Sequence, residues 1–320
     1  MDRTTFRKQH KKGRKLLFIL VPILTIILLV VCYGVYLTFK VADATSEAQQ
    51  ELKRGNKSEK RAVPIDPSKD NFSVLLVGVD EREGETNSRS DALILATFNK
   101  TEKTVKMVSI PRDTRVDIPE HDKDKINHAH AFGGIDLTIE TVEELFDIPV
   151  DYYVKLNFDA FVEIIDALGG VTVEVPKTFS EQNSKDEQDA ITLYEGIQTL
   201  NGEEALAFVR MRKDDPTGDI GRGERQKQVI KAIIEKSASL TSVTKYDDVI
   251  DSIGSNLVTN LSFGNLVALQ SYSKALNSIE SLKLVGNDSR IRGLYYYELE
   301  EQSLLDISSQ LKQHLDILEQ

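Results

Sequence analysis

The stretch FSVLLVGV, from Phe72 to Val79, is the first part of the chain that reads as a buried β-strand, and Asp80 follows it directly. It is apolar on both faces, which is typical of strands that helices cover on both sides of a sheet. Four more segments rich in Val, Ile, Leu and aromatic residues predict strands. These segments are Ala92–Phe98, Val105–Ile110, Tyr152–Leu156 and Val171–Val175.

Helical periodicity alternates with these strands, so the pattern predicts an α/β fold. Asn201 with Glu204 three residues later is typical of a capping box, and Ser262 is a candidate helix cap. The alternation from Val209 to Arg212 predicts a strand, and the polar stretch 178–190 predicts a surface loop. The expected helices are Ile135–Phe146, Ala160–Leu168, Glu224–Leu240, Phe263–Leu276 and Gln302–Leu318, and Ser281–Val285 is the last expected strand.

Composition limits the classes of function. The 320 residues include 40 Lys and Arg against 51 Asp and Glu, a net charge of −11. Residues 1–15 alone carry +6, which leaves −17 for the rest of the chain. Such an acidic body is unsuited to general nucleic-acid binding, because phosphate backbones require basic surface. The single cysteine, Cys32, excludes an intramolecular disulfide and a cysteine-based zinc site.

Residues 16–39 contain 24 residues without a charge, long enough to cross a bilayer as a helix. The basic tail at 1–15 predicts a cytoplasmic N-terminus and an extracytoplasmic body. A cleaved signal peptide ending at Ala42-Asp43-Ala44 is the alternative, but its apolar region would be unusually long. We therefore expect a single retained membrane anchor, a polar stalk over 40–69 and an outer domain over 70–320.

Familiar nucleophile and nucleotide motifs are absent from the sequence, including G-x-S-x-G, Walker A, H-E-x-x-H and G-x-G-x-x-G. Three histidines, His121, His128 and His130, are conceivable metal ligands, although polar surface histidines are the default interpretation.

Arginine placement is more informative. Eight of the ten arginines after residue 69 fall in two short windows, whereas lysine is spread more evenly. The planar guanidinium fork suits oxyanions such as phosphate. The alternative is that these arginines pair with local carboxylates on the surface. The eight are Arg82, Arg89, Arg112, Arg115, Arg210, Arg212, Arg222 and Arg225.

Their spacing also favours an anion site. Arg210 and Arg212 would share one face of a strand, two residues apart. Arg222, Arg225 and Gln226 are spaced to lie near one face at the start of a helix, where the helix dipole favours an anion.

Two carboxylates accompany these arginines. Asp80 ends the first expected strand and Asp91 begins the second. If the two strands are neighbours, both acids meet at one edge of the sheet. Two carboxylates together with water and phosphate oxygens form a suitable Mg²⁺ site, while the alternative role for each is a turn or cap aspartate.

In order along the chain, these motifs resemble the LytR–CpsA–Psr family of cell-wall enzymes, over about Phe72 to Ile234. The matching stretches are Gly78–Arg82, Arg89–Asp91, Ser109–Thr114, Lys125–Ala129, Leu168–Val171, Leu200–Leu206, Arg210–Arg212 and Gly218–Gln226. One mild departure is His130, where the family often has other residues.

The resemblance implies an α-β-α sandwich with a central mixed sheet and an apolar groove for a polyprenyl tail. It implies transfer of an anionic, teichoic acid-like glycopolymer from undecaprenyl diphosphate to a peptidoglycan hydroxyl at the membrane. Asp80 and Asp91 would hold Mg²⁺ or Mn²⁺, and Asp219 or an activated Arg112 would take part in catalysis. The diphosphate would be gripped by Arg89, Arg112, Arg210, Arg212, Arg222, Arg225 and Gln226.

Two rival functions remain open on the sequence. A polyprenyl diphosphate phosphatase, with water as the acceptor, would use the same residues. A non-enzymatic membrane regulator or envelope scaffold is the other, although a 15-residue cytoplasmic tail argues against direct control of DNA.

Overall fold

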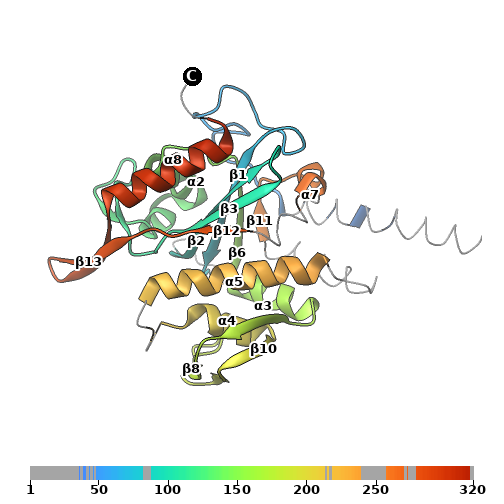
Figure 1. Ribbon diagram of the computed structural model, residues 1–320, viewed down its shortest axis with the longest axis vertical. Helices are drawn as coiled ribbons and strands as arrows, with labels where there is room; N and C mark the ends of the chain where they lie inside the picture. Colours follow the sequence, from blue (N-terminus) through green and yellow to red (C-terminus); the bar gives the residue numbers. More distant parts are fainter. Residues whose placement is uncertain are drawn as a thin grey trace, which may run out of the picture. The chain divides into compact units, whose positions relative to one another are not determined.

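The computed structural model (Figure 1) describes residues 36, 39, 40, 43, 46, 48–81, 88–212, 215, 218–238, 257–269, 272 and 279–317. Two units are distinguished, Met1–Asp43 and Ala44–Gln320, and the account below concerns the second. No helix among the described residues is long and apolar enough to cross a bilayer. The predicted anchor over 16–39 lies outside the described residues except for Tyr36 and Phe39.

A six-stranded mixed sheet forms the centre of the domain, in the order β11-β6-β1-β2-β3-β12. The first strand, β1, pairs antiparallel with β2 and parallel with β6, so the predicted α/β fold with a mixed sheet is confirmed. The strands are β1 (Phe72–Val79), β2 (Ser90–Asn99), β3 (Thr104–Ser109), β6 (Tyr152–Asn157), β11 (Leu257–Thr259) and β12 (Glu280–Leu282).

Helices cover both faces of this sheet (Figure 1). On β1, Leu75 and Val77 belong to one core with α2 (His128–Phe146) and α8 (Glu301–Leu315). Val74 belongs to the opposite core, to which α5 (Gly218–Ala238) and α7 (Phe263–Leu269) contribute. Alternate residues of one strand thus fill two cores, because successive side chains point to opposite faces. This explains the unbroken apolar run that opens at Phe72.

A third core lies on the far side of α5 from the sheet (Figure 1). Val229 and Ala232 of α5 pack into it, so this helix contributes to two cores. The capping box predicted at Asn201 is confirmed, with both reciprocal hydrogen bonds formed at 2.9 Å. The elements of this part are α3 (Phe158–Ala167), β7 (Val171–Val175), β8 (Phe179–Glu181), β9 (Ile191–Leu193), β10 (Gly196–Leu200) and α4 (Gly202–Arg210).

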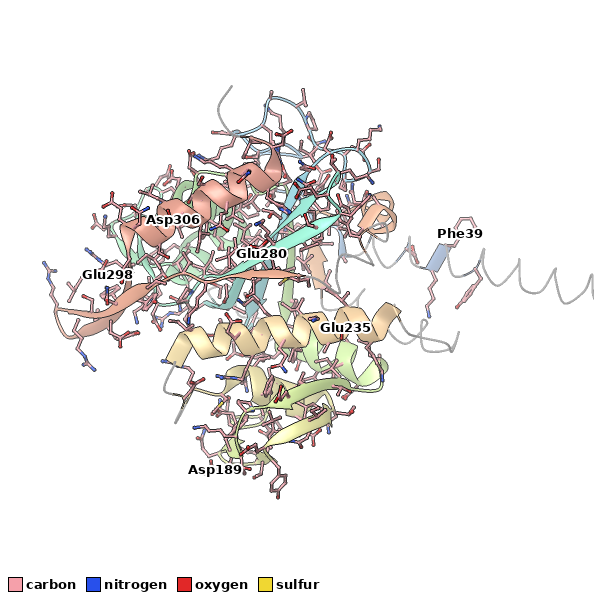
Figure 2. All side chains as sticks on the ribbon, viewed as in Figure 1. Phe39, Asp189, Glu235, Glu280, Glu298 and Asp306 are labelled. Atoms are coloured by element: carbon pink, nitrogen blue, oxygen red, sulfur yellow. The ribbon has the colours of Figure 1, made fainter. Side chains whose placement is uncertain are left out.

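A C-terminal hairpin of β13 (Gly286–Ile291) and β14 (Leu294–Leu299) has no counterpart in the sequence-based expectations. Its turn, Arg292-Gly293, has positive φ at both residues (52° and 84°), as in the tight turns that match strand twist. Glu298 of this hairpin, labelled in Figure 2, pairs with Arg115 of β4 (Arg115–Val116) at 3.3 Å. β4 itself pairs with β5 (Asp124–Lys125).

The strand predicted over Val209–Arg212 is wrong. Val209 and Arg210 end helix α4, and Met211 is its C-terminal cap. Ala205, Leu206, Phe208 and Val209 are buried, so helical burial prevails over the short alternation of polar and apolar residues.

Residues 178–190 are not wholly a loop either. Strand β8 pairs with β9, and Ser180 and Thr192 share a hydrogen bond of 2.9 Å on its exposed face. A short strand that is exposed on one face carries little apolar signal.

The predicted stalk differs as well, because residues 48–70 pack on the domain. Leu52 is buried in the core of α2 and α8. Arg54 pairs with Glu143 at 2.5 Å and Arg61 pairs with the buried Asp151 at 2.8 Å. Polar composition alone predicts a linker, but these cations find buried carboxylate partners that the sequence does not reveal.

Candidate functional site

Asp80 and Asp91 lie at the same edge of the β1–β2 pair, as expected for antiparallel neighbours. Gly78 pairs with Ala92 and Val79 pairs with Ser90, so Asp91 has no partner in β1. A residue added to one strand in this way redirects its side chain. Both acids line one charged cavity of about 510 Å³.

This charged cavity gathers arginines from segments about a hundred residues apart in the sequence. Arg112 comes from the loop after β3, and Arg222 from the second turn of α5. The structure brings together four of the predicted diphosphate ligands and both predicted metal ligands. The lining residues are Asp80, Asp91, Arg112, Glu181, Gln182, Arg210, Arg212 and Arg222.

Asp91 is the centre of this arrangement. Its Oδ1 lies 2.5 Å from Nη1 of Arg112 and 3.6 Å from Nη2 of Arg222. The Arg222 side chain is 8% exposed, so its positive charge lies at the cavity although the side chain is almost wholly buried. Burying this guanidinium is favourable only with a carboxylate or another anion beside it.

An apolar cavity of about 110 Å³ adjoins the charged one, and Asp91, Arg210 and Arg222 line both. The remaining walls come from the sheet and from α3, α4 and α5. They are Leu76, Val77, Gly78, Ala92, Ile94, Leu156, Asn157, Phe158, Phe161, Leu206, Val209, Gln226 and Ile230.

Arg210 marks the boundary between the two cavities. Its guanidinium carbon lies 4.1 Å from the centre of the Phe158 ring, a cation–π contact. It also donates a 3.0 Å hydrogen bond to the carbonyl of Asn183. Phe158 is therefore both a wall of the apolar cavity and a support for a charge of the neighbouring one.

Arg225 lines neither cavity, although its spacing predicted a diphosphate ligand. Its Nη1 lies 2.5 Å from the buried Asp215 carboxylate. Its Nε donates to the Phe208 carbonyl at 3.1 Å, and its Nη2 donates to the Met211 carbonyl. These contacts join α5 to the end of α4, because the side chain at this helical position points into the protein.

The other predicted residues are distributed around the site. Arg89 is exposed beside Asp91 but does not line either cavity, whereas Gln226 lines the apolar one. Asp219 is the second residue of α5, and its side chain lies outside the described part, as does Arg82.

Three carboxylates, Asp80, Asp91 and Glu181, line the charged cavity, and the first two are the predicted metal ligands. Within the described residues there is no cluster of three or more His, Cys, Asp and Glu. His128 pairs with Asp124 at 2.6 Å, and the buried His130 bonds to the Ser88 carbonyl, so the histidines do not converge. Asp80 and Asp91 fit a Mg²⁺ ion that takes most of its ligands from phosphate and water, since Mg²⁺ binds proteins in this way.

Sequence reasoning missed several wall residues. Glu181 is the last residue of β8 and Gln182 follows it, in a stretch that was expected to be a loop. No signal in the sequence connects these two residues to the arginines. Phe158 and Phe161, spaced three apart on α3, are a detectable signal, because two aromatic residues on one helical face require an apolar partner.

A cavity with apolar walls that continues into an arginine-rich one defines a class of protein that binds an amphiphile with an anionic head. The chain belongs to the LytR–CpsA–Psr family, whose family model matches residues 35–313.

The chain is similar to curated and solved members. A relative from Bacillus subtilis, named polyisoprenyl-teichoic acid–peptidoglycan teichoic acid transferase TagT, is 45% identical over 322 residues, covering 99% of both chains. A solved structure, TagT bound to LI-WTA, superimposes with a TM-score of 0.73 at 46% identity, covering 83% of this chain and 99% of the other. Another, TagT with bound octaprenyl pyrophosphate lipid, has a TM-score of 0.69 at 44% identity and the same coverage.

Proposed function

We propose that the protein transfers an anionic glycopolymer, similar to teichoic acid, from a polyprenyl diphosphate carrier to a hydroxyl group of peptidoglycan. The observation that carries this proposal is the sharing of Asp91, Arg210 and Arg222 between the apolar and the charged cavity. The names of the relatives, and a relative solved with octaprenyl pyrophosphate, support it.

The two halves of the donor match the two cavities. The isoprenoid tail lies in the apolar cavity, where its burial contributes about 25 cal/mol for each Å² of apolar surface. The diphosphate lies against Arg112, Arg210, Arg212 and Arg222, whose forks match phosphate oxygens. Arg89 contacts the head group from the rim of the charged cavity. Gln226, which lines the apolar cavity, contacts the end of the head group nearest to the tail. Arg225 stays a structural residue in this proposal.

Asp80 and Asp91 together hold Mg²⁺, or Mn²⁺, on the diphosphate. When bound, this ion neutralises charge on the phosphate oxygens and thereby assists the leaving group. Asp91 also pairs with Arg112 and Arg222, so this carboxylate connects the proposed metal site to arginines that would bind the diphosphate.

The reaction breaks the bond between the bridging oxygen and the phosphorus attached to the glycopolymer. A peptidoglycan hydroxyl attacks this phosphorus, a phosphodiester forms, and polyprenyl monophosphate leaves. The arginines stabilise negative charge that develops in the transition state. The attacking hydroxyl must lose a proton, and Asp219 in the first turn of α5 is the candidate acceptor. Arg112 takes part as a guanidinium, which stabilises charge on the phosphate and accepts no proton.

The place of this reaction follows from the substrates. Residues 16–39 anchor the chain in the membrane by a single span, with the basic tail 1–15 in the cytoplasm and the domain outside. The donor arrives already activated, which suits a compartment without ATP, and the anchor keeps the enzyme beside a lipid-linked substrate.

Product analysis tests this function against hydrolysis. The purified protein is incubated with a synthetic polyprenyl diphosphate-linked glycan, with and without peptidoglycan. Transfer predicts polyprenyl monophosphate and peptidoglycan-linked glycan in equal amounts, and little turnover without the acceptor. Equal turnover with and without peptidoglycan would instead indicate a phosphatase, and no turnover would favour a scaffold.

A further inference from the structure

The stretch Lys125–Ala129, which matches a family motif, and His130 after it line neither cavity. Together they comprise the end of β5 and the first turn of α2. Three separate contacts connect them to the segments that carry Arg112 and Asp91. These contacts indicate that the stretch holds Arg112 and Asp91 in place.

The first contact comes from Lys125. Its Nζ lies 2.6 Å from Oδ1 of Asp113, a carboxylate whose side chain is 8% exposed. Oδ2 of Asp113 lies 3.7 Å from Nε of Arg112, too far for a hydrogen bond but close enough for charge attraction. Arg112 in turn binds Asp91 at 2.5 Å, and Asp91 lies 3.6 Å from Arg222. Positive and negative groups thus alternate along five side chains.

The second contact is made by the backbone. The N–H of Asn127, at the N-cap of α2, donates a 3.2 Å hydrogen bond to the carbonyl of Arg112. The loop that carries Arg112 is therefore held to the helix by its main chain as well as through the Asp113 carboxylate.

The third contact comes from His130, which is 5% exposed. Its Nδ1 lies 2.7 Å from the carbonyl of Ser88, three residues before Asp91. Burial, with a contribution from Lys155, lowers the pKa of His130, while the Ser88 bond and Glu81 oppose this shift. The imidazole is thus neutral at pH 7 with its proton on Nδ1, because a carbonyl can only accept. This hydrogen bond fixes the backbone just before β2, the strand that carries Asp91.

We propose that Lys125, at the end of β5, and His130, in the first turn of α2, are positioning residues that set the geometry of the Arg112–Asp91 pair. Lys125 acts through Asp113 on Arg112, and His130 acts through Ser88 on Asp91. This inference rests on the proposed function for its kinetic consequences, but not for its structural ones.

The Lys125 arm is tested by kinetics. Lys125→Met removes the charge and keeps the chain length, and Lys125→Arg keeps the charge. We expect Lys125→Met to lower kcat for transfer by about tenfold or more with KM for the lipid donor nearly unchanged, because displaced groups mainly affect the transition state. Lys125→Arg should restore most of kcat. The matched control is Lys123→Met, whose exposed partner Asp117 lies 3.2 Å away.

A double-mutant cycle separates positioning from a general structural effect. In an Arg112→Ala background, Lys125→Met should cause no further loss, because its route to the substrate is gone. The same fractional loss in both backgrounds would overturn the proposal, as would full activity of Lys125→Met.

The His130 arm has its own pair of variants. Asparagine places an amide N–H near the position of Nδ1, whereas phenylalanine fills the space without a donor. We expect His130→Phe to reduce kcat and His130→Asn to retain it. If both variants lose activity equally, the donor to Ser88 is irrelevant and the His130 assignment fails.

Crystal structures of Lys125→Met and His130→Phe provide a readout that does not depend on turnover. The proposal predicts that the Arg112–Asp91 contact opens by about 1 Å or more, an amount sufficient to impair catalysis. An unchanged contact in both variants would overturn it even if the parent protein is an active transferase. If the parent has no transferase activity but the contact opens, the proposed function fails and the positioning role remains.

Discussion

The guanidinium of Arg112 lies 2.5 Å from the carboxylate of Asp91, Nη1 to Oδ1, at the edge of the β1–β2 pair. Both groups are candidates for contact with the same diphosphate, one directly and one through a metal ion. Asp91 therefore stands between the arginines that would bind the diphosphate and the proposed metal site, so binding of diphosphate and binding of metal should be coupled at this residue.

Replacing Asp91 tests this coupling. Asp91→Asn keeps the shape of the side chain and removes its charge. We expect Mg²⁺-dependent transfer to fall by about ten- to a hundredfold, since a charged hydrogen bond or ligand contributes about 1.5–3 kcal/mol. The measurement is initial rate against Mg²⁺ concentration, with the exposed Asp117→Asn as the control. An unchanged Mg²⁺ dependence would remove Asp91 from the metal site.

Arg222 and Arg225, three residues apart on α5, should respond differently to substitution. Arg222→Lys should weaken donor binding and transfer by about tenfold or more, because lysine keeps the charge but loses the fork that matches phosphate. Its folding should be less affected, since one positive charge still faces Asp91. Calorimetric titration with a polyprenyl diphosphate and Mg²⁺ measures the binding. Normal affinity of the lysine variant would indicate that the charge alone matters.

Arg225→Met should instead destabilise the fold. The substitution leaves the Asp215 carboxylate buried without its partner and removes hydrogen bonds to two carbonyls. Breaking one partner of a buried pair costs about 3–5 kcal/mol. Urea unfolding checks this, with the exposed Arg212→Ala as a variant that keeps its stability but loses donor affinity. Wild-type stability of Arg225→Met would contradict the structural assignment.

The apolar cavity can be tested by filling it. Ile230 of α5 lies on its wall, and Ile230→Trp inserts a larger side chain. We expect weaker binding of a long-chain polyprenyl diphosphate, because the tail loses apolar burial. Binding of a short-chain isoprenyl diphosphate should change little. Equal loss for both ligands would mean that the substitution disturbs the charged cavity rather than the tail site.

His314 on α8 predicts a pH effect on stability that is separate from activity. Burial lowers its pKa to about 4, and its ring nitrogens bond to Thr97 and Thr104 at 2.8 and 2.9 Å. The unfolded state therefore binds a proton that the folded state does not, between pH of about 6.5 and about 4. Stability should fall as pH decreases through this window.

The size of this loss is on the order of 1–2 kcal/mol after allowance for solvent screening. His314→Gln, which does not titrate, should flatten the dependence relative to the parent protein in urea unfolding at several pH values. The exposed His121→Gln is the matched control and should keep the parental slope. An identical slope in the His314 variant would refute the assignment.

Much of the sheet could be predicted from sequence because its strands are strongly apolar. Phe72–Val79 is a strand of this sheet with the predicted bounds, and Val171–Val175 is a strand with the predicted bounds in a separate two-stranded sheet. The edge that joins Asp80 and Asp91 follows from the pairing of β1 with β2. The first strand of the β13–β14 hairpin is largely exposed and polar, so it carries no apolar periodicity. The second, with buried Tyr296 and Tyr297, was missed although its tyrosines favour a strand. The packing of residues 48–70 was missed for a different reason, since it depends on charge pairs with partners far along the chain.

For the arginines too, the sequence predicted one part of the arrangement and not another. Enrichment in two windows predicted that Arg112, Arg210, Arg212 and Arg222 share a site, and they line one cavity. Helical spacing could not separate Arg222 from Arg225, because three residues on a helix differ by about 60° in direction. Whether that angle leads into a cavity or to the buried Asp215 carboxylate depends on how the end of α4 and the loop after it pack against α5, which helical spacing does not reveal.

In the proposed function, one site holds a metal ion and a lipid-linked diphosphate together at Asp80 and Asp91. Electron–nuclear double resonance of bound Mn²⁺, in the presence of a polyprenyl diphosphate, measures this contact directly. The account predicts a phosphorus hyperfine coupling in the parent protein and its loss in the variant carrying both Asp80→Asn and Asp91→Asn. Phosphorus coupling of equal strength in that variant, or none in the parent protein with donor bound, would contradict it.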